Sequence, residues 1–376
     1  MRTVLTTIVL SMAFAVGGVG TVEGQPAPVI DSVGQALIEN QPGGAVVGLL
    51  DNDTTRLHAF GAADSTGRLP TARTVFEVGS ITKTFTGLLL ADAIERGWVA
   101  RSTPVGALLP DSVTVGTADS TPITLGHLAT HRSGLLRLPA NLNSALRPTD
   151  PYAAYGDSAL YTFLDGYELP RAPGTKYQYS NLGAGLLGHL LARRADTTYA
   201  ALVRRRIAKP LGLSDTRIDL TDAQQSRFAQ GHTRTGAPAP PWHFDALAGA
   251  GALRATAADM LAYLRAHHRA LAASPGTATA LQSAMRRAAT IHDSADSEGP
   301  RVGLGWHQST RDGHEVLWHN GGTGGFRSFV ALDRETGHGA VVLVSTVLAT
   351  RRVTEAGFAL LGALRPARPA PPDSSP

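Results

Sequence analysis

The chain has 376 residues, of which 43% are hydrophobic and 17% charged, so it is globular in composition and long enough to bury a large core. Its formal charge is +4, but the arginines are scattered in pairs and one triplet, Arg204–Arg206, so nucleic acid is not an expected partner. The absence of cysteine excludes disulfides, thiol catalysis and a lipid-carrying N-terminal cysteine.

Residues 1–24 have the composition of a secretory signal peptide. Met1 and Arg2 supply a short basic start, and no charged residue follows from Val4 to Val22. We therefore expect cleavage near Gly24 and export, to the periplasm or as a secreted protein. An uncleaved membrane anchor is the alternative, because the uncharged run is almost long enough to span a bilayer. If the signal is cleaved, no stable membrane association is expected.

After the signal, the pattern predicts a short helix at Ile30–Ile38 and two strands, Ala45–Leu50 and Arg56–Ala62. Asn52 and Asp53 are turn formers, so these strands should form a β-hairpin. From Ser80 to about Ala288 the pattern is mostly helical. The predicted helices are Ser80–Ile94, Ile123–Leu135, Leu182–Leu191, Tyr199–Lys209 and Ala257–Leu271, the last capped by Thr256.

Two loops interrupt the helical region. Arg137–Tyr155 is long and rich in Pro, Asn and Ala, and long loops inside compact domains usually carry a function, so it is a candidate wall over a pocket. Pro238–Pro241 marks the second loop. Beyond Arg301 the hydrophobic period becomes that of strands. The predicted strands are Val302–Gln308, Glu315–His319, Phe326–Asp333 and Gly339–Ser345, followed by a helix at Val353–Leu364.

A hairpin at one end of the chain and three or four strands at the other are too few to form two stable sheets. We therefore predict an α+β fold in which both ends build one antiparallel sheet, flanked by helices. The sheet part would contain residues 25–79 and 290–365, and the helical part residues 80–289, with the active site in the cleft between them. Residues 366–376 are rich in Pro and Ser and are expected to be disordered.

The first candidate for chemistry is Ser80, followed three residues later by Lys83 at the start of an apolar helix. Residues three apart share a helix face, so the hydroxyl and the amine can meet. A serine becomes a good nucleophile when a base takes its proton, and a lysine whose pKa is lowered by burial is such a base. The chain uses Arg almost everywhere else, its other lysines being Lys176 and Lys209. The structural alternative is an N-capping serine with a lysine one turn on.

A second candidate is Tyr179-Ser180-Asn181, at a junction between a loop and a helix. A tyrosine beside a lysine ammonium would have a lowered pKa and could relay the serine proton. The Asn181 amide could orient Lys83 or a substrate carbonyl. The structural alternative is a packed tyrosine with an N-capping Ser180.

A third candidate is the glycine-rich segment that starts at Trp318 and continues through His319, Asn320, Gly321 and Gly322. Glycines before a strand allow backbone N–H groups to approach a ligand closely, as an oxyanion hole requires. A phosphate-binding loop is a weak alternative, since no Gly-Lys-Ser/Thr follows and no helix begins here.

Other enzyme classes lack their signatures. The sequence contains no Gly-x-Ser-x-Gly elbow, which argues against an α/β-hydrolase. The histidine pairs His127 with His131 and His267 with His268 have no acidic or histidine partner at metalloprotease spacing. We therefore expect no metal and no other cofactor.

The ordered motifs Ser-x-x-Lys, Tyr-x-Asn and His-x-Gly resemble those of the serine β-lactamase and penicillin-binding-protein superfamily. The resemblance covers about Ile30 to Leu364 and is closest to the class C β-lactamase-like branch, which includes DD-peptidases and family VIII esterases. It implies an exported serine hydrolase with a small-molecule substrate, foremost a β-lactamase that opens the β-lactam amide through an acyl-enzyme at Ser80. The alternatives are a DD-peptidase, a family VIII-type esterase, or a non-catalytic protein that binds peptidoglycan peptides.

The resemblance also implies roles for individual residues. Ser80 looks like the acylated nucleophile, Lys83 like its activating partner and Tyr179 like the proton relay. Asn181 resembles the amide that orients the substrate.

The third motif departs from the class C pattern, because His319-Asn320-Gly321 stands where these enzymes usually carry Lys-Thr-Gly. A neutral histidine would hold the carboxylate of a β-lactam less well near pH 7, although Arg327 could compensate. Gly322 looks like the second oxyanion donor, beside the Ser80 N–H. The sequence leaves the true substrate, the deacylation rate and the oligomeric state open.

Overall fold

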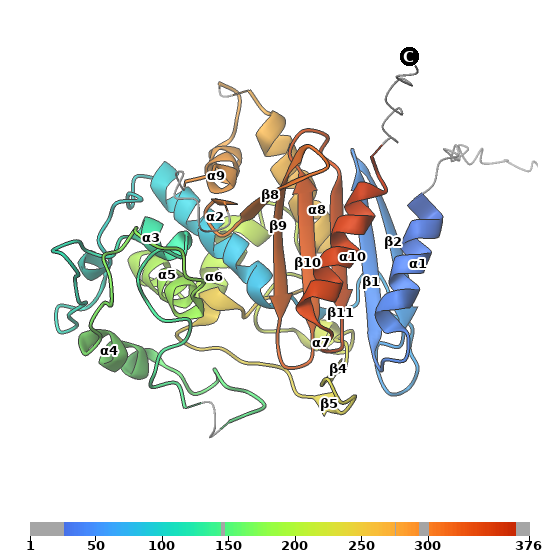
Figure 1. Cartoon of the computed structure of the whole chain (residues 1–376), viewed down its shortest axis with the longest axis horizontal. Coiled ribbons are helices and arrows are strands. Elements are labelled where there is room, and N and C mark those ends of the chain that lie inside the picture. The colour runs from blue at the N-terminus through green and yellow to red at the C-terminus, as the bar shows by residue number, and fades with distance from the viewer. Residues whose placement is uncertain (1–25, 144–146, 275, 293–300, 366–376) are drawn as a thin grey trace, which may run out of the picture.

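A computed structural model describes residues 26–143, 147–274, 276–292 and 301–365 of the chain (Figure 1). The predicted signal peptide and C-terminal tail lie outside these residues. Within them, a sheet with its covering helices packs beside a mostly helical part. The turn that holds Ser80 contacts both the sheet and the helix that follows it. No helix in the described ranges has the length and apolar character needed to cross a bilayer.

The sheet has seven antiparallel strands in the order β2-β1-β11-β10-β9-β8-β7. Its strands are β1 (Gly44–Asp51), β2 (Thr54–Gly61), β7 (Arg301–Val302), β8 (His307–Arg311), β9 (His314–Gly322), β10 (Arg327–Asp333) and β11 (Gly339–Val344). The two chain ends join where β1 pairs with β11, with Ala45 opposite Val344. The predicted α+β fold with one sheet from both ends is therefore confirmed, as is the hairpin turn, where Asn52 has φ 54°.

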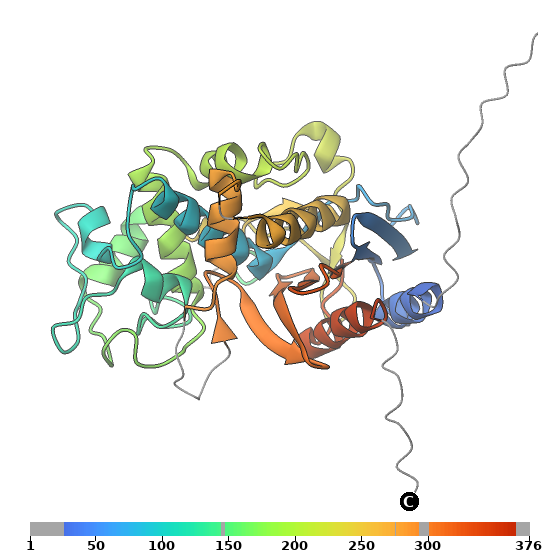
Figure 2. The same cartoon turned by 90° about the horizontal axis from the view of Figure 1, so that it is seen from above.

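The sheet separates two cores because side chains alternate between its faces. On β10, Val330 and Leu332 face the core shared with the helical part, whereas Phe329 and Ala331 face the outer core. Two helices, α1 (Pro26–Ile38) and α10 (Thr350–Gly362), cover the outer face, and α8 (Ala257–Ala272) packs on the inner face (Figure 2). Thr256 caps α8 as predicted, by accepting from the Asp259 N–H.

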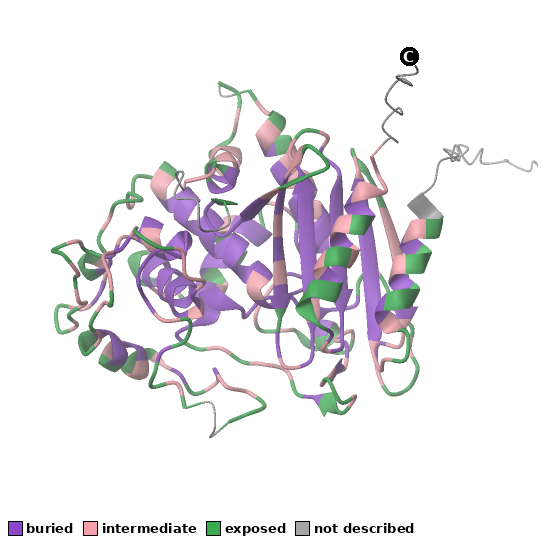
Figure 3. Ribbon diagram, in the orientation of Figure 1, coloured by how far each residue is buried: buried purple, intermediate pink, exposed green. Residues whose placement is uncertain are grey.

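The helical part surrounds α2 (Thr82–Glu95), which is buried from Thr82 to Ala93 (Figure 3). Its other helices are α3 (Leu125–Ala129), α4 (Asp157–Asp165), α5 (Asn181–Arg194), α6 (Tyr199–Val203), α7 (Asp222–Gln225) and α9 (Ala280–Ala289). Two small sheets pair β3 (Phe76–Glu77) with β6 (Arg254–Ala255) and β4 (Gly231–His232) with β5 (Pro238–Ala239). Because α2 is buried on all sides, its apolar residues are not confined to one face of the helix.

Several predicted elements are wrong in detail. Val302–Gln308 is two strands, since Gly305 turns the chain at φ 79° and packs against the Lys83 carbonyl. The helix predicted at Ile123–Leu135 ends at Ala129, and the chain then turns at His131, with φ 59°. The loop predicted at Pro238–Pro241 contains β5. The range predicted as the helical part includes α8, which lies on the sheet.

Candidate active site

Lys83 brings three distant parts of the chain together. Its Nζ lies 3.0 Å from Ser80 Oγ, 2.9 Å from Asn181 Oδ1 and 2.7 Å from the carbonyl oxygen of Ala250. The side chain is 2% exposed, and burial, together with the charge of Arg137, holds the pKa of Lys83 well below 10.5.

These three contacts suit both protonation states of the amine, since an ammonium can donate to all three oxygens. The lowered pKa favours the neutral form. Asn181 Oδ1 and the Ala250 carbonyl can only accept, so each takes one of the two N–H bonds of a neutral lysine. The remaining lone pair then points to the Ser80 hydroxyl, which can donate. In its neutral form, this amine can accept the proton of the Ser80 hydroxyl.

The position of Ser80 differs slightly from the prediction. It lies in a 3₁₀ turn, Gly79–Ile81, and the α-helix begins at Thr82. The turn is held by the Ile81 N–H, which donates to the Val78 carbonyl at 3.2 Å. Ser80 is thus fixed immediately before α2, with Lys83 in the first turn of that helix.

Tyr179 lies beside both groups. Its ring centroid is 4.9 Å from Lys83 Nζ, and its hydroxyl hydrogen-bonds with Ser80. The prediction of a lowered tyrosine pKa is wrong: burial raises the pKa of Tyr179 to about 12, despite the Ser80 hydrogen bond and the charge of Arg137. The phenol is therefore protonated at neutral pH and can donate a proton.

Asn181 is the first residue of α5, and the preceding Ser180 is an N-cap whose Oγ accepts from the Gly183 N–H at 2.8 Å. Ser180 thus caps the helix, as the structural alternative predicts, while the Asn181 side chain contacts Lys83. The Asn181 Nδ2 donates to the Tyr152 hydroxyl at 3.0 Å, which orients the amide with its oxygen toward the lysine.

The glycine-rich end of β9 packs directly against the turn that carries Ser80. A Cβ on Gly79, whose φ is 50°, would lie 2.6 Å from the Gly322 nitrogen. A Cβ on Gly321 would lie 2.1 Å from the Val78 carbonyl oxygen and 3.1 Å from the Ser80 nitrogen. Only glycine allows this approach at either position.

The Gly322 N–H points out of the sheet ladder. The Thr323 N–H donates to the Phe326 carbonyl at 3.1 Å, so these two residues form a hydrogen-bonded pair. Along antiparallel strands, such pairs alternate with pairs that are not hydrogen-bonded. The next pair, Gly322 opposite Arg327, is therefore the non-hydrogen-bonded type. The N–H groups of Ser80 and Gly322 thus lie close together and are available to an oxyanion.

His319 lies on the same face of β9 as Gly321 and is 1% exposed. Its Nδ1 is 2.6 Å from the Asn320 carbonyl oxygen, which can only accept, so Nδ1 carries the proton and Nε2 is an acceptor. Burial and the nearby His307 and Lys83 hold the pKa of His319 well below 6.5. The third motif is therefore neutral.

Two other predicted binding residues lie differently. Asn320 is on the opposite face of β9 and donates to Thr354 Oγ1 of α10 at 3.0 Å, so its side chain does not reach Ser80. Arg327 donates through Nε to the Leu348 carbonyl and through Nη1 to the Thr323 and Phe326 carbonyls. Its guanidinium holds the turn after β9 together, which leaves it poorly placed to replace the charge of a third-motif lysine.

Sequence reasoning missed several groups at the site. His307 stacks on His319 with 4.8 Å between ring centroids, and His131 lies 4.4 Å from the ring of Tyr179. The Ala250 carbonyl had no sequence signal, because any residue supplies a carbonyl. The guanidinium of Arg137 lies 5.0 Å from the centroid of the Tyr179 ring. The sequence did contain a signal for this residue, because it stands at the start of the long loop.

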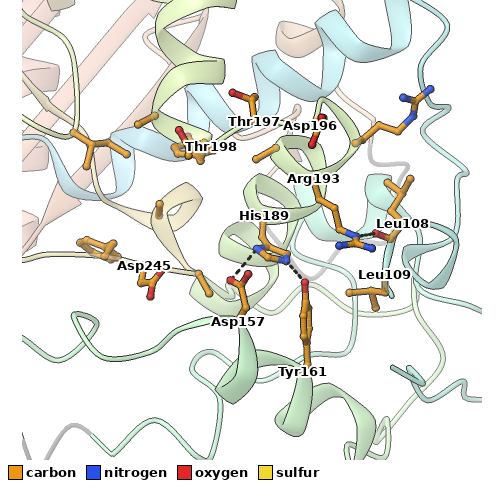
Figure 4. A pocket seen from close by; sticks show the side chains of 18 of the residues that line it. Leu108, Leu109, Asp157, Tyr161, His189, Arg193, Asp196, Thr197, Thr198 and Asp245 are labelled. Carbon is orange, nitrogen blue, oxygen red and sulfur yellow. Dashed lines mark hydrogen bonds and ion pairs between the residues drawn. The ribbon is translucent and has the colours of Figure 1, made fainter. Parts of the chain in front are cut away.

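A cavity of about 910 Å³ lies elsewhere, in the helical part, and none of the predicted site residues lines it (Figure 4). In it, His189 lies 2.7 Å from the Tyr161 hydroxyl and 3.5 Å from the Asp157 carboxylate. Its volume alone does not connect it with the chemistry at Ser80. Among the described residues, no group of three His, Cys, Asp or Glu side chains is arranged to hold a metal ion.

The fold and the site agree with one family. The β-lactamase family profile matches residues 30–364, and the chain belongs to this family. A β-lactamase of Pseudomonas fluorescens is 27% identical over 372 residues, 89% of this chain and 98% of that protein. The D-alanyl-D-alanine-carboxypeptidase/endopeptidase AmpH of Escherichia coli is 27% identical over 75% of this chain and 74% of its own. Penicillin-binding protein 4 of Amycolatopsis lactamdurans is 27% identical over 89% of this chain and 91% of its own.

Proposed function

We propose that this protein is an exported serine hydrolase that forms an acyl-enzyme at Ser80, with the amide of a β-lactam as its first substrate. The observation that carries the proposal is the hydrogen bond between Lys83 Nζ and Ser80 Oγ, made by a lysine with two further acceptors and a lowered pKa. The relatives named β-lactamase support the substrate class.

In this mechanism Ser80 Oγ attacks the substrate carbonyl carbon while its proton passes to Lys83 Nζ. The N–H groups of Ser80 and Gly322 stabilise the resulting oxyanion. Collapse breaks the carbon–nitrogen bond, and the leaving nitrogen takes a proton from the Tyr179 hydroxyl, which Lys83 then reprotonates. Water attacks the ester, and Ser80 regains its proton.

The test compares the purified protein with its Ser80→Ala variant on a chromogenic cephalosporin, following colour and intact mass. Turnover that is lost in the variant supports a β-lactamase. A lasting mass adduct on Ser80 without turnover supports a penicillin-binding peptidase. With neither, the β-lactam proposal is overturned.

An esterase is the second candidate, and the neutral His319 favours it. Without a cation in the third motif, an uncharged ester loses less binding than a carboxylate-bearing β-lactam. Hydrolysis of short p-nitrophenyl esters that depends on Ser80, without cephalosporin turnover, would identify this activity.

A non-catalytic peptide-binding protein is the alternative of another class. It has no need of the contacts among Ser80, Lys83 and Tyr179, which argue for catalysis. If the Ser80→Ala variant retained the full biological activity, the binding function would replace the hydrolase.

A further inference from the structure

The third motif of this protein offers a substrate no positive charge. His319 is buried, donates through Nδ1 to a backbone carbonyl, and leaves Nε2 as an acceptor with no hydrogen-bond partner among the described residues. A carboxylate also only accepts hydrogen bonds, so it cannot pair with this nitrogen. Any anion recognition must come from another side of the site.

The opposite, helical side carries a cation next to the reacting groups. The guanidinium of Arg137 lies 5.0 Å from the centroid of the Tyr179 ring, and Lys83 Nζ lies 4.9 Å from the same centroid. Arg137 is exposed. Within the described part of the chain, the structure gives its guanidinium no hydrogen bond and no ion pair. Its donors are therefore free for a ligand.

The backbone of Arg137 is fixed by the same helix that positions Asn181. Its carbonyl oxygen accepts from the N–H groups of Asn181, at 2.9 Å, and Leu182, at 3.2 Å. The adjacent Leu136 carbonyl accepts from Ser180 Oγ at 2.6 Å. Arg137 thus belongs to a rigid junction with the first turn of α5, although it begins a long loop.

The charge of Arg137 affects the pKa of several groups at the site. It contributes to the lowered pKa of Lys83 and of His131, and it opposes the raised pKa of Tyr179. A charge that these groups sense also acts on an anionic substrate held beside Tyr179.

We propose that Arg137 is the specificity-determining residue of this site and binds a carboxylate of the substrate, in place of a third-motif lysine. The inference rests on the proposed serine hydrolase function and names its substrate class: acyl compounds with a carboxylate near the scissile bond. The carboxylate can lie on the acyl group or on the leaving group, and the guanidinium binds either through paired N–H donors.

The test uses two pairs of esters that differ in one charge. Mono-p-nitrophenyl succinate and its methyl ester differ on the acyl side, whereas 4-acetoxybenzoate and its methyl ester differ on the leaving group. For each pair, kcat/KM for the anionic ester is divided by kcat/KM for the neutral one. The ratio cancels any general loss of catalysis in a variant.

We expect Arg137→Gln to lower this ratio about tenfold for at least one pair, and Arg137→Lys to lower it less, because lysine keeps the charge but loses the paired donors. The pair that responds identifies the side on which the carboxylate lies. Raising the salt concentration should reduce the ratio of the wild type toward that of Arg137→Gln, since the charge is exposed.

Arg193→Ala is the matched control. Arg193 is an exposed arginine of α5, about 18 Å along the helix from Asn181, and it donates to the Leu108 carbonyl in the cavity of Figure 4. This variant should leave both ratios unchanged.

The outcomes separate this inference from the proposed function. Ratios unchanged in Arg137→Gln, with neutral esters still hydrolysed through Ser80, would overturn the role of Arg137 alone. An equal loss on both members of each pair would also overturn it, because a purely structural role has that effect. Ester hydrolysis that persists in Ser80→Ala would instead overturn the hydrolase proposal.

Discussion

Lys83 and Asn181 are 98 positions apart in the chain and share a hydrogen bond of 2.9 Å. This bond joins α2, which follows Ser80, to α5, which begins at Asn181. When Lys83 is neutral, Asn181 Oδ1 takes one of its two N–H bonds, because an amide oxygen can only accept. The lone pair of a neutral lysine is left for the serine.

The first prediction concerns the base itself. Lys83→Arg keeps a positive charge but removes a group that can lose its proton, so Ser80 acylation should fall at least about a hundredfold. Stopped-flow measurement of acylation, or kcat/KM for a p-nitrophenyl ester, checks this. Lys176→Arg is the control because Lys176 is exposed. Near-normal acylation in Lys83→Arg would exclude Lys83 as the base.

The second prediction follows from the lowered pKa of Lys83. Only the neutral amine is a base, so kcat/KM should rise with pH as the ammonium loses its proton, with the midpoint well below 10.5. Asn181→Asp places a negative charge beside the ammonium, which stabilises it and raises its pKa. The rising limb should therefore move to higher pH in this variant.

The measurement is the pH dependence of kcat/KM for a neutral ester in the wild type, the nearly isosteric Asn181→Asp and the truncated Asn181→Ala. The alanine variant lacks the added charge and should not move the limb in the same direction as aspartate. A limb that stays in place in Asn181→Asp would mean that another group sets the pH dependence.

The third prediction concerns the contact between the nucleophile turn and β9. In Gly79→Ala the new methyl group would meet the Gly322 nitrogen at 2.6 Å, in a residue whose φ is already 50°. Either the Gly79–Ile81 turn or the end of β9 must move. We therefore expect kcat/KM to fall about a hundredfold or more, as it does when an oxyanion donor is lost.

Gly97→Ala is the control for backbone strain alone. Gly97 has φ 68°, but a Cβ there would meet no atom within 4 Å. This variant should lose about 1 kcal/mol of folding stability and retain its activity. If the two variants showed equal kcat/KM, close packing at Gly79 would not be required for catalysis.

Much of the architecture was predictable because it follows from local patterns. Alternating apolar residues and the Asn52-Asp53 turn define the β1–β2 hairpin, and the first two motifs predict that Ser80, Lys83 and Tyr179 lie together. These patterns together also predicted a single sheet, because neither end of the chain has enough strands to form a stable sheet alone.

The remaining details depend on three-dimensional contacts that no local pattern contains. The direction of the Asn320 side chain follows from the β9 register, which turns it toward Thr354. The raised pKa of Tyr179 comes from burial beneath the surrounding elements. Arg137 reaches the site only because its carbonyl accepts from the first N–H groups of α5, on a segment more than forty residues away in the chain.

The last prediction concerns stability and a histidine far from the catalytic groups. His267 on α8 is 0% exposed, and its ring lies edge-on to Tyr263 and Trp306. Neither ring nitrogen has a hydrogen-bond partner among the described residues. Burial lowers the pKa of His267 from 6.5 to about 3, so the folded protein holds it neutral over most of the acid range.

The sign of the pH effect follows from the two states. Above pH 6.5 the ring is neutral in both states and costs nothing, but below pH 6.5 it binds a proton only in the unfolded chain. The free energy of unfolding should therefore fall as the pH falls from 6.5 toward 3, by about 2 kcal/mol at pH 5 from this residue.

His267→Leu removes the titrating group and keeps an apolar side chain between the two aromatic rings. The variant should resist acid better than the wild type, and the difference in unfolding free energy should grow between pH 6.5 and pH 5, as measured by urea unfolding at several pH values. His268→Leu, on the neighbouring position of α8, is the control. Parallel pH curves for the wild type and His267→Leu would show that His267 does not contribute to acid lability.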